Sequence, residues 1–356
     1  MKKKVFMFLL SLTMCSSVLP QVSVFANQIS NTEEYTSSIN DVIFKQIEDI
    51  EDILIKNILS DENIVLGDVS IAEPIKIVNT NRYMFPVLND GKIIKFIELS
   101  ENEKGGYFIS IGNFFANKLN ELPNNNYVIF ENENGNIFAT DGKQQFSLKN
   151  NKEDKNTYKI EDFSNEFENN FINTNSNKVI YDINEASIKN KLSLEKSGYW
   201  NYQYPEVIQP PNSNACWAAC MSSILRGLGM NYSLNDVLNN AGKNENDTSS
   251  SKEVIEYFKD YGIYGEIKSQ SYPHTENSLR EQIRDNGAAI WQAMGGYKGG
   301  HAVVIYGYQS TGSSLWVSIM DPAAPDGQAR YDCSVDKYGL FSHDGRISTE
   351  YIVDLY

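Results

Sequence analysis

The sequence predicts an α+β protein, in which helical and strand-like patterns occupy separate stretches of the chain. In the C-terminal half, segments with apolar residues at helical spacing come first and apolar strand-like runs follow. In the N-terminal half, one helix-like stretch precedes short strand-like runs, two of which flank Asn89-Asp90-Gly91, a turn typical of β-hairpins. We therefore expect two α+β domains in succession, in agreement with the length of 356 residues.

The composition excludes several classes of protein. There are 31 Lys+Arg against 46 Asp+Glu, which gives a net charge of −15 and argues against nucleic acid as the main partner. Hydrophobic residues make up 41%, which is enough for a buried core. No internal apolar run approaches the roughly 20 residues of a membrane span, so we expect a mature protein without a membrane span.

The first 26 residues have the features of a secretory signal peptide. Lysines at positions 2 to 4 precede the apolar run Val5–Leu12, and Val24-Phe25-Ala26 offers a cleavage site. We expect cleavage after Ala26 and secretion. A lipoprotein anchored at Cys15 is the alternative, which Met14 disfavours because a small residue is preferred there.

Residues 27–195 are predicted to fold without carrying chemistry. All four Trp and all three His of the sequence lie beyond residue 195. Apolar residues at helical spacing predict a first helix: Ile39, Ile43, Ile47, Ile50, Leu54 and Ile58. The expected strands are Tyr83–Leu88, Lys92–Leu99, Tyr107–Ile111, Tyr127–Glu131 and Ile137–Thr140. From about Gly142 to Lys191 the chain is rich in Asn, Lys, Glu and Ser, which indicates a linker that proteases can cut.

Residues 196–356 are predicted to form the domain that carries the chemistry. A first helix is expected to begin at a cap, Ser213 or Asn214, and to run to Leu228. The other expected helices are Leu234–Asn240, Lys252–Tyr261 and Glu276–Asp285, and the expected strands are Ala288–Met294, His301–Tyr308 and Leu315–Met320.

Four residues of this domain are candidates for nucleophilic catalysis. Cys216 lies in the first turn of its helix, where peptide dipoles favour the thiolate. His301 begins a strand and can serve as its base. Asp321 ends the next strand and can orient the imidazole, and Gln209 can donate N–H to an oxyanion beside the backbone N–H of Cys216.

Simpler interpretations of these residues stay open. Cys216 can be ordinary small-residue packing, and with Cys220, Cys333 and a histidine it can form a zinc site, although Cys-x-x-Cys pairs are absent. Cys220 and Cys333 are expected either to form a disulfide or to be free thiols of the core. His274 and His343 lie in polar stretches and are expected to be solvated.

The motifs resemble a known family. Gln209 followed seven residues later by Cys216-Trp217-Ala218-Ala219, then Gly300-His301-Ala302-Val303-Val304 and Asp321-Pro322, is similar to the papain-like cysteine proteases. The compact bacterial branch, the staphopains and avirulence-effector proteases, is the most similar, over roughly residues 196–356. The resemblance implies a helical lobe facing an antiparallel β lobe, with Cys216 as nucleophile, His301 as base and acid, Asp321 as orienting group and Gln209 in the oxyanion hole. Asp321 stands where papain and staphopain use Asn.

The resemblance also implies a function for the whole chain. It predicts a secreted cysteine endopeptidase made as a zymogen, with residues 27–195 as an inhibitory propeptide that is cut off between about residues 185 and 200. Protein or peptide substrates are the expected partners, no cofactor or metal is expected, and a dedicated protein inhibitor stays open. The alternatives are a papain-like acyltransferase, and a secreted binding protein that has the fold but no activity.

Overall fold

The computed structural model divides the chain into two compact units, residues 1–50 and 51–356. It describes residues 39–59, 67–101, 106–123, 126–132, 135–148, 171–173, 177–183, 198–200, 204–295, 300–311, 314–324 and 329–355. The predicted signal peptide and the lipoprotein alternative at Cys15 lie outside these residues.

The first helical region is interrupted where the sequence predicts one continuous helix. Residues 39–45 are helical, Gln46 is in a turn, and α2 covers Ile47–Leu59. At the interruption the backbone N–H of Gln46 bonds to the carbonyl of Ile43, three residues back, which is a tighter turn than the α-helical pattern.

The five strands predicted in the N-terminal part are present, together with two strands, β1 (Val69–Ala72) and β2 (Ile75–Ile77), and a short helix, α3 (Ala116–Glu121), that the sequence did not predict. The hairpin of β3 (Arg82–Asn89) and β4 (Lys92–Glu101) turns at Asp90 and Gly91, whose φ angles of 50° and 77° are those of a tight hairpin turn. The other elements are β5 (Tyr107–Gly112), β6 (Asn126–Glu131) and β7 (Ile137–Thr140).

The segment expected to be a linker from about residue 142 contains three short strands. They are β8 (Gln145–Ser147), β9 (Ile172–Asn173) and β10 (Val179–Ile183). Strand β10 pairs with β1 and lies at the end of the strand order, where its side chains are mostly exposed or half-buried. An edge strand needs few apolar residues, so the polar composition of this segment gave no indication of β10.

The C-terminal elements begin with β11 (Gly198–Trp200) and the predicted helices. These are α6 (Cys216–Gly227), α7 (Leu234–Asn240), α8 (Ser251–Asp260) and α9 (Glu276–Leu279), which continues into the π-helical turn η2 (Arg280–Asp285). The strands are β12 (Glu266–Lys268), β13 (Ile290–Gly295), β14 (His301–Ser310), β15 (Leu315–Met320), β16 (Arg330–Val335), β17 (Ser342–His343) and β18 (Arg346–Val353).

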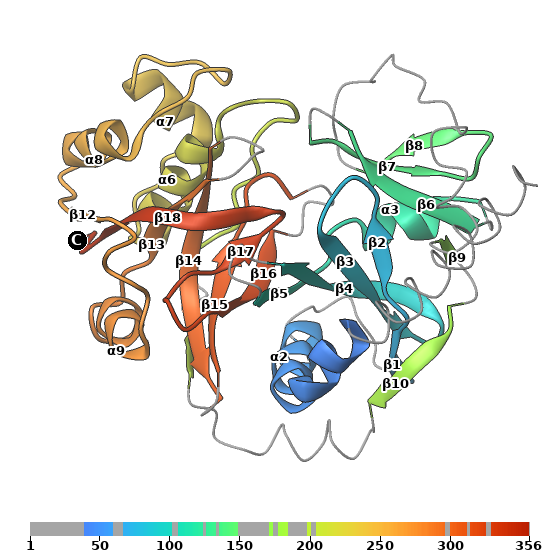
Figure 1. Cartoon of the computed structure of the whole chain (residues 1–356). Helices are drawn as coiled ribbons and strands as arrows, with labels where there is room; N and C mark the ends of the chain where they lie inside the picture. Colours follow the sequence, from blue (N-terminus) through green and yellow to red (C-terminus); the bar gives the residue numbers. More distant parts are fainter. Residues whose placement is uncertain are drawn as a thin grey trace, which may run out of the picture. The chain divides into compact units, whose positions relative to one another are not determined.

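Strands from both predicted domains join in one large antiparallel sheet of 14 described strands (Figure 1). Its order is β10-β1-β3-β4-β5-β16-β15-β14-β13-β18-β12. The junction is the pairing of β5 with β16, in which Ser110 lies opposite Cys333 and Gly112 opposite Tyr331. The sheet therefore continues across residue 195, and the described strands on both sides of it belong to one compact unit.

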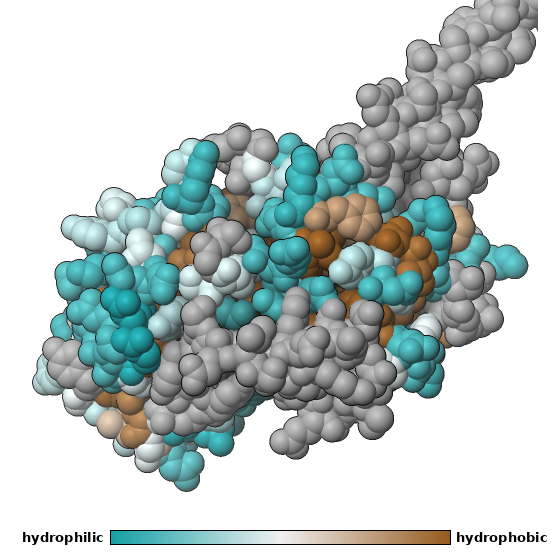
Figure 2. All heavy atoms as spheres, turned by 90° about the horizontal axis from the view of Figure 1, so that it is seen from below, coloured by the Kyte–Doolittle hydropathy of each residue, from teal (hydrophilic) through white to brown (hydrophobic). Residues whose placement is uncertain are grey.

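Helix α6 packs against strand β14, and α7 and α8 lie beside α6 (Figure 1). The buried face of α6 includes Trp217, Met221, Ile224 and Leu225, as the apolar spacing predicts. The same hydrophobic core extends to Phe96 and other residues of the N-terminal sheet. Figure 2 shows one face of the molecule, on which several groups of hydrophobic residues lie among hydrophilic ones. The α+β class is confirmed.

Candidate active site

Cys216 is the first residue of helix α6 and lies on the wall of a cleft. The helix begins after Ala215, which has no side-chain cap, so the expected cap at Ser213 or Asn214 is wrong by one or two residues. Ser213 Oγ instead accepts a hydrogen bond from the backbone N–H of Ala215 at 3.4 Å. The position leaves the sulfur at the positive end of the helix dipole, half-buried rather than enclosed in the core.

His301 and Asp321 are brought together by the pairing of neighbouring strands. His301 is the first residue of β14, and Asp321 directly follows β15. Val304 pairs with Met320 in the antiparallel register, which places the two residues at the same end of the strand pair. His301 Nε2 and Asp321 Oδ1 are 2.7 Å apart, and both side chains are 6% exposed. This bond turns the other ring nitrogen, Nδ1, toward the cleft.

The electrostatic environment favours a thiolate–imidazolium pair. Burial by itself raises the pKa of Cys216, but hydrogen bonding to His301, the charge of His301 and the N–H groups of Ala302 and Trp217 outweigh it, and the pKa is lowered. Burial lowers the pKa of His301, but the carboxylate of Asp321 and the hydrogen bond to Cys216 raise it to about 9. Burial disfavours the charged form of Asp321, but the two histidines that it binds hold its pKa well below the usual range. A reactive cysteine needs these shifts.

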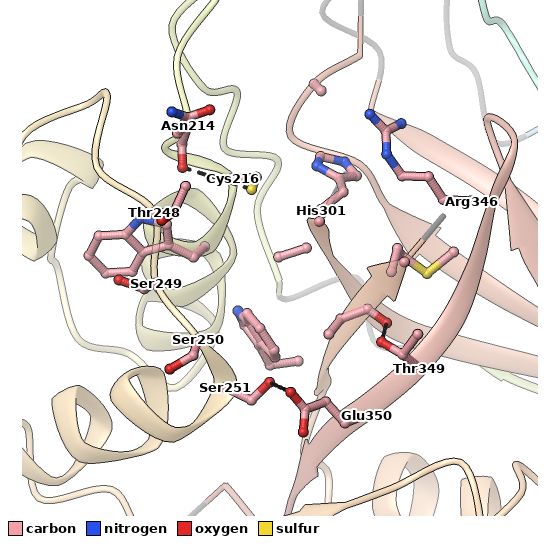
Figure 3. Close-up of a pocket in the computed structure, with 18 of the residues that line it drawn as sticks. Asn214, Cys216, Thr248, Ser249, Ser250, Ser251, His301, Arg346, Thr349 and Glu350 are labelled. Carbon is pink, nitrogen blue, oxygen red and sulfur yellow. Dashed lines mark hydrogen bonds between the residues drawn. The ribbon is translucent and has the colours of Figure 1, made fainter. Parts of the chain in front are cut away.

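The cleft has one wall from the helices and one from the strands (Figure 3). Its volume is about 620 Å³. Cys216 and His301 face each other across it, with Ser250 and Ser251 on the helical side and Glu350 on β18. Ser251 Oγ donates to Glu350 Oε1 at 2.6 Å and so links the two walls. All the lining residues lie between positions 209 and 350.

Gln209 lines the same cleft, as the sequence predicts. Its backbone N–H bonds to the carbonyl of Pro322, which ties this loop to the residue after Asp321. Its Nε2 donates to the carbonyl of Ser213 at 2.9 Å, which uses one of the two amide protons.

The structure also reveals a residue that the sequence analysis missed. His343 Nε2 lies 2.9 Å from Asp321 Oδ2, and its side chain is 2% exposed. The expectation that His343 and His274 are solvated is wrong, because both are buried. His274 bonds to Gln292, and burial lowers its pKa to about 4. The turn Asp344-Gly345, with φ angles of 49° and 71°, is a hairpin signal that would have placed His343 on a strand.

The three cysteines of the described region are free thiols, so the alternative of a Cys220–Cys333 disulfide is wrong. Both of these thiols are fully buried, and burial raises their pKa well above the usual value. No cluster of three or more histidine, cysteine or carboxylate side chains suited to a metal ion occurs among the residues that the structure describes. None of the described helices combines the length and apolar character that a membrane crossing needs.

Two comparisons with known proteins gave a match. Residues 199–341 match the Peptidase_C39 like family. Among solved structures, the peptidase domain of Streptococcus ComA, a bi-functional ABC transporter involved in quorum sensing, matches with 17% identity and a TM-score of 0.30. That match covers 41% of this chain and 95% of the ComA domain. No curated protein matches the chain.

The family match identifies a cysteine-type peptidase, a hydrolase, within residues 199–341. The matched region contains Cys216, His301 and Asp321.

Proposed function

We propose that the chain is a secreted cysteine endopeptidase that is made as a zymogen and cleaves protein substrates through Cys216, His301 and Asp321. The motifs that resemble the staphopains and avirulence-effector proteases support a place in that compact bacterial branch. The match to a peptidase family over residues 199–341 supports the hydrolytic class.

One observation carries this proposal. A half-buried cysteine at a helix N-terminus faces a histidine across the cleft, and the histidine is hydrogen-bonded to a buried carboxylate. Structural cysteines are normally enclosed, as Cys220 is, and have a raised pKa. Cys216 differs from Cys220 in both respects, although the two residues are one helical turn apart.

The geometry supports an acyl-enzyme mechanism. The Cys216 thiolate attacks the peptide carbonyl carbon, and the oxyanion accepts hydrogen bonds from the backbone N–H of Cys216 and from Gln209 Nε2. His301 then gives its Nδ1 proton to the leaving amine, and the C–N bond breaks. Water attacks the thioester carbonyl as His301 takes a proton from it, the C–S bond then breaks, and loss of the product acid restores the thiolate–imidazolium pair.

Secretion and maturation are proposed from the sequence. The lysines, apolar run and Ala26 site support export, and the polar composition before residue 196 supports cleavage between about residues 185 and 200. Sequencing the N-terminus of the secreted active protein tests both. A fully active protein that begins at Asn27 and carries no internal cut would contradict the zymogen proposal.

Replacement of the nucleophile tests the activity. We expect Cys216→Ala to abolish cleavage of an unstructured protein such as casein, and iodoacetamide to inactivate the wild type by modifying Cys216. Cys220→Ala is the matched control, because Cys220 lies on the same helix and is fully buried. We expect this variant to keep its activity. Mass spectrometry of the products, with an added amine, separates hydrolysis from acyl transfer. Cleavage that persists in Cys216→Ala would refute the proposal.

A further inference from the structure

The carboxylate of Asp321 binds two imidazoles, only one of which the proposed mechanism uses. Oδ1 lies 2.7 Å from His301 Nε2 and also accepts the backbone N–H of Ala323 at 2.8 Å. Oδ2 lies 2.9 Å from His343 Nε2. Because His343 is bonded to the other oxygen, it limits rotation of the carboxylate and thereby fixes the direction in which Oδ1 faces His301.

A chain of hydrogen-bonded side chains continues from His343 to Ser110 and Cys333. A carboxylate only accepts, so His343 donates its Nε2 proton and presents Nδ1 to Ser110 Oγ at 3.2 Å. Ser110 Oγ lies 3.3 Å from Cys333 Sγ. Burial raises the pKa of Cys333, so this thiol keeps its proton and forms a neutral thiol–hydroxyl hydrogen bond with Ser110. His343 is therefore bonded on both ring nitrogens, to Asp321 through Nε2 and to Ser110 through Nδ1.

Residues of β5, of the turn that follows it and of β16 enclose His343. Ser110 belongs to β5, which pairs with β16 next to the catalytic strands. The ring of Tyr331 lies 4.3 Å and that of Phe114 5.8 Å from the imidazole, measured between centroids. Tyr331 lies over Gly112, where any larger side chain would collide with its ring. The N-terminal region thus supplies both the polar partner of His343 and part of its apolar enclosure.

We propose that Ser110 and His343 are positioning residues for the catalytic carboxylate Asp321. The strands before residue 195 then supply a hydrogen-bond partner that the active site needs, and they stay part of the active enzyme. This inference rests on the proposed function for its kinetic consequences. It extends that function because it gives residues 69–183 a role after maturation. A cut between about residues 185 and 200 lies outside both β5 and β16, so we expect their pairing to persist after it.

Two substitutions of His343 separate positioning from packing. His343→Phe keeps a planar ring without an N–H donor, and His343→Gln keeps an N–H donor near the position of Nε2. We expect the Phe variant to lower kcat by about 30-fold with KM within about twofold, and the Gln variant to stay within about threefold of the wild type. In the Phe variant the alkaline limb of the pH profile moves to higher pH, because Asp321, having lost one donor, holds the His301 proton more tightly.

A matched pair of serine substitutions tests the N-terminal contribution. Ser110→Ala removes the hydroxyl that bonds to His343 Nδ1 and is expected to lower kcat about five- to tenfold. Ser100→Ala removes another buried hydroxyl that bonds across the same junction, to Ser342 Oγ at 3.5 Å, but has no contact with the imidazole chain. We expect Ser100→Ala to keep the wild-type kcat. Thermal unfolding of all four variants shows whether each is folded at the assay temperature.

The rate at which iodoacetamide alkylates Cys216, measured as a function of pH, reports the ionisation of the Cys216–His301 pair and needs no peptide substrate. If the wild type hydrolyses no peptide but His343→Phe still shifts the alkylation profile and His343→Gln does not, the proposed function fails and the positioning role stands. Equal effects of the Phe and Gln variants, or of Ser110→Ala and Ser100→Ala, would overturn the positioning role. A profile in His343→Phe that coincides with the wild type would also overturn it.

Discussion

Replacing Asp321 by asparagine tests the electrostatic basis of the site. The substitution keeps the shape of the side chain and removes one negative charge at a position where the side chain is 6% exposed. Two imidazoles bind this carboxylate, at 2.7 Å and 2.9 Å. Because the amide is neutral, it cannot stabilise the imidazolium form of His301 to the same degree.

The magnitude follows from the pKa of His301. Asp321 is the largest of the groups that raise this pKa from the ordinary value of 6.5 to about 9, against the effect of burial. If the pKa returns to its ordinary value or below, the population of the thiolate–imidazolium pair falls by about 10²–10³, since each pH unit is a factor of ten. We expect kcat/KM near pH 7 to fall by a similar factor.

The assay is kcat/KM for a fluorogenic peptide between pH 5 and pH 10, together with the rate of Cys216 alkylation. In Asp321→Asn the alkaline limb of the kcat/KM profile should move from about pH 9 to lower pH. Asp332→Asn is the matched control, because Asp332 is buried on the adjacent strand and binds Ser318 and Asn57 but no histidine. An Asp321→Asn enzyme that keeps its alkaline limb near pH 9 and loses less than threefold in kcat/KM would refute this reasoning.

Three further predictions concern the wild-type site and the junction of the sheets. With one equivalent of iodoacetamide at pH 7, peptide mapping should find the label on Cys216 and not on the two buried thiols; equal labelling of all three would contradict the pKa assignments. Activity should rise as the pH passes the lowered pKa of Cys216 and fall as it passes about 9, where His301 loses the proton it gives to the leaving amine; a profile still rising at pH 10 would exclude this assignment. Arg82→Met should lower the free energy of unfolding by about 3–5 kcal/mol in urea titrations, because it removes the buried guanidinium that pairs with the carboxylates of Glu98, Glu131 and Asp344; a change under 1 kcal/mol would show that the cluster adds little.

A control accompanies the last of these. Lys259→Met removes an exposed cation whose partner, Glu256, is also exposed. Surface pairs contribute about 0–1 kcal/mol, so this variant should unfold at nearly the wild-type urea concentration. The comparison separates the effect of burial from that of losing any positive charge.

Local sequence was sufficient to predict most elements that hold the site. Helical spacing and flanking turns predicted α7 with its observed bounds, and the apolar run at Leu315–Met320 predicted β15. The catalytic candidates Cys216 and His301 could be predicted because each lies at the first residue of a strongly patterned element. Such patterns act over a few residues, and the sequence contains them directly.

Contacts between distant segments could only be found in the tertiary structure. Nothing near Ser110 in the sequence indicates that it lies opposite Cys333 and binds His343, because strand pairing over more than 200 residues depends on the complete sheet. The polar surroundings of His343 predicted a solvated side chain, and its burial arises from rings contributed by other strands. The sequence by itself thus determined most of the elements and the candidate residues Cys216 and His301, whereas the folded sheet decided which side chains bond to Asp321, since hydrogen bonding and desolvation depend on distance in space.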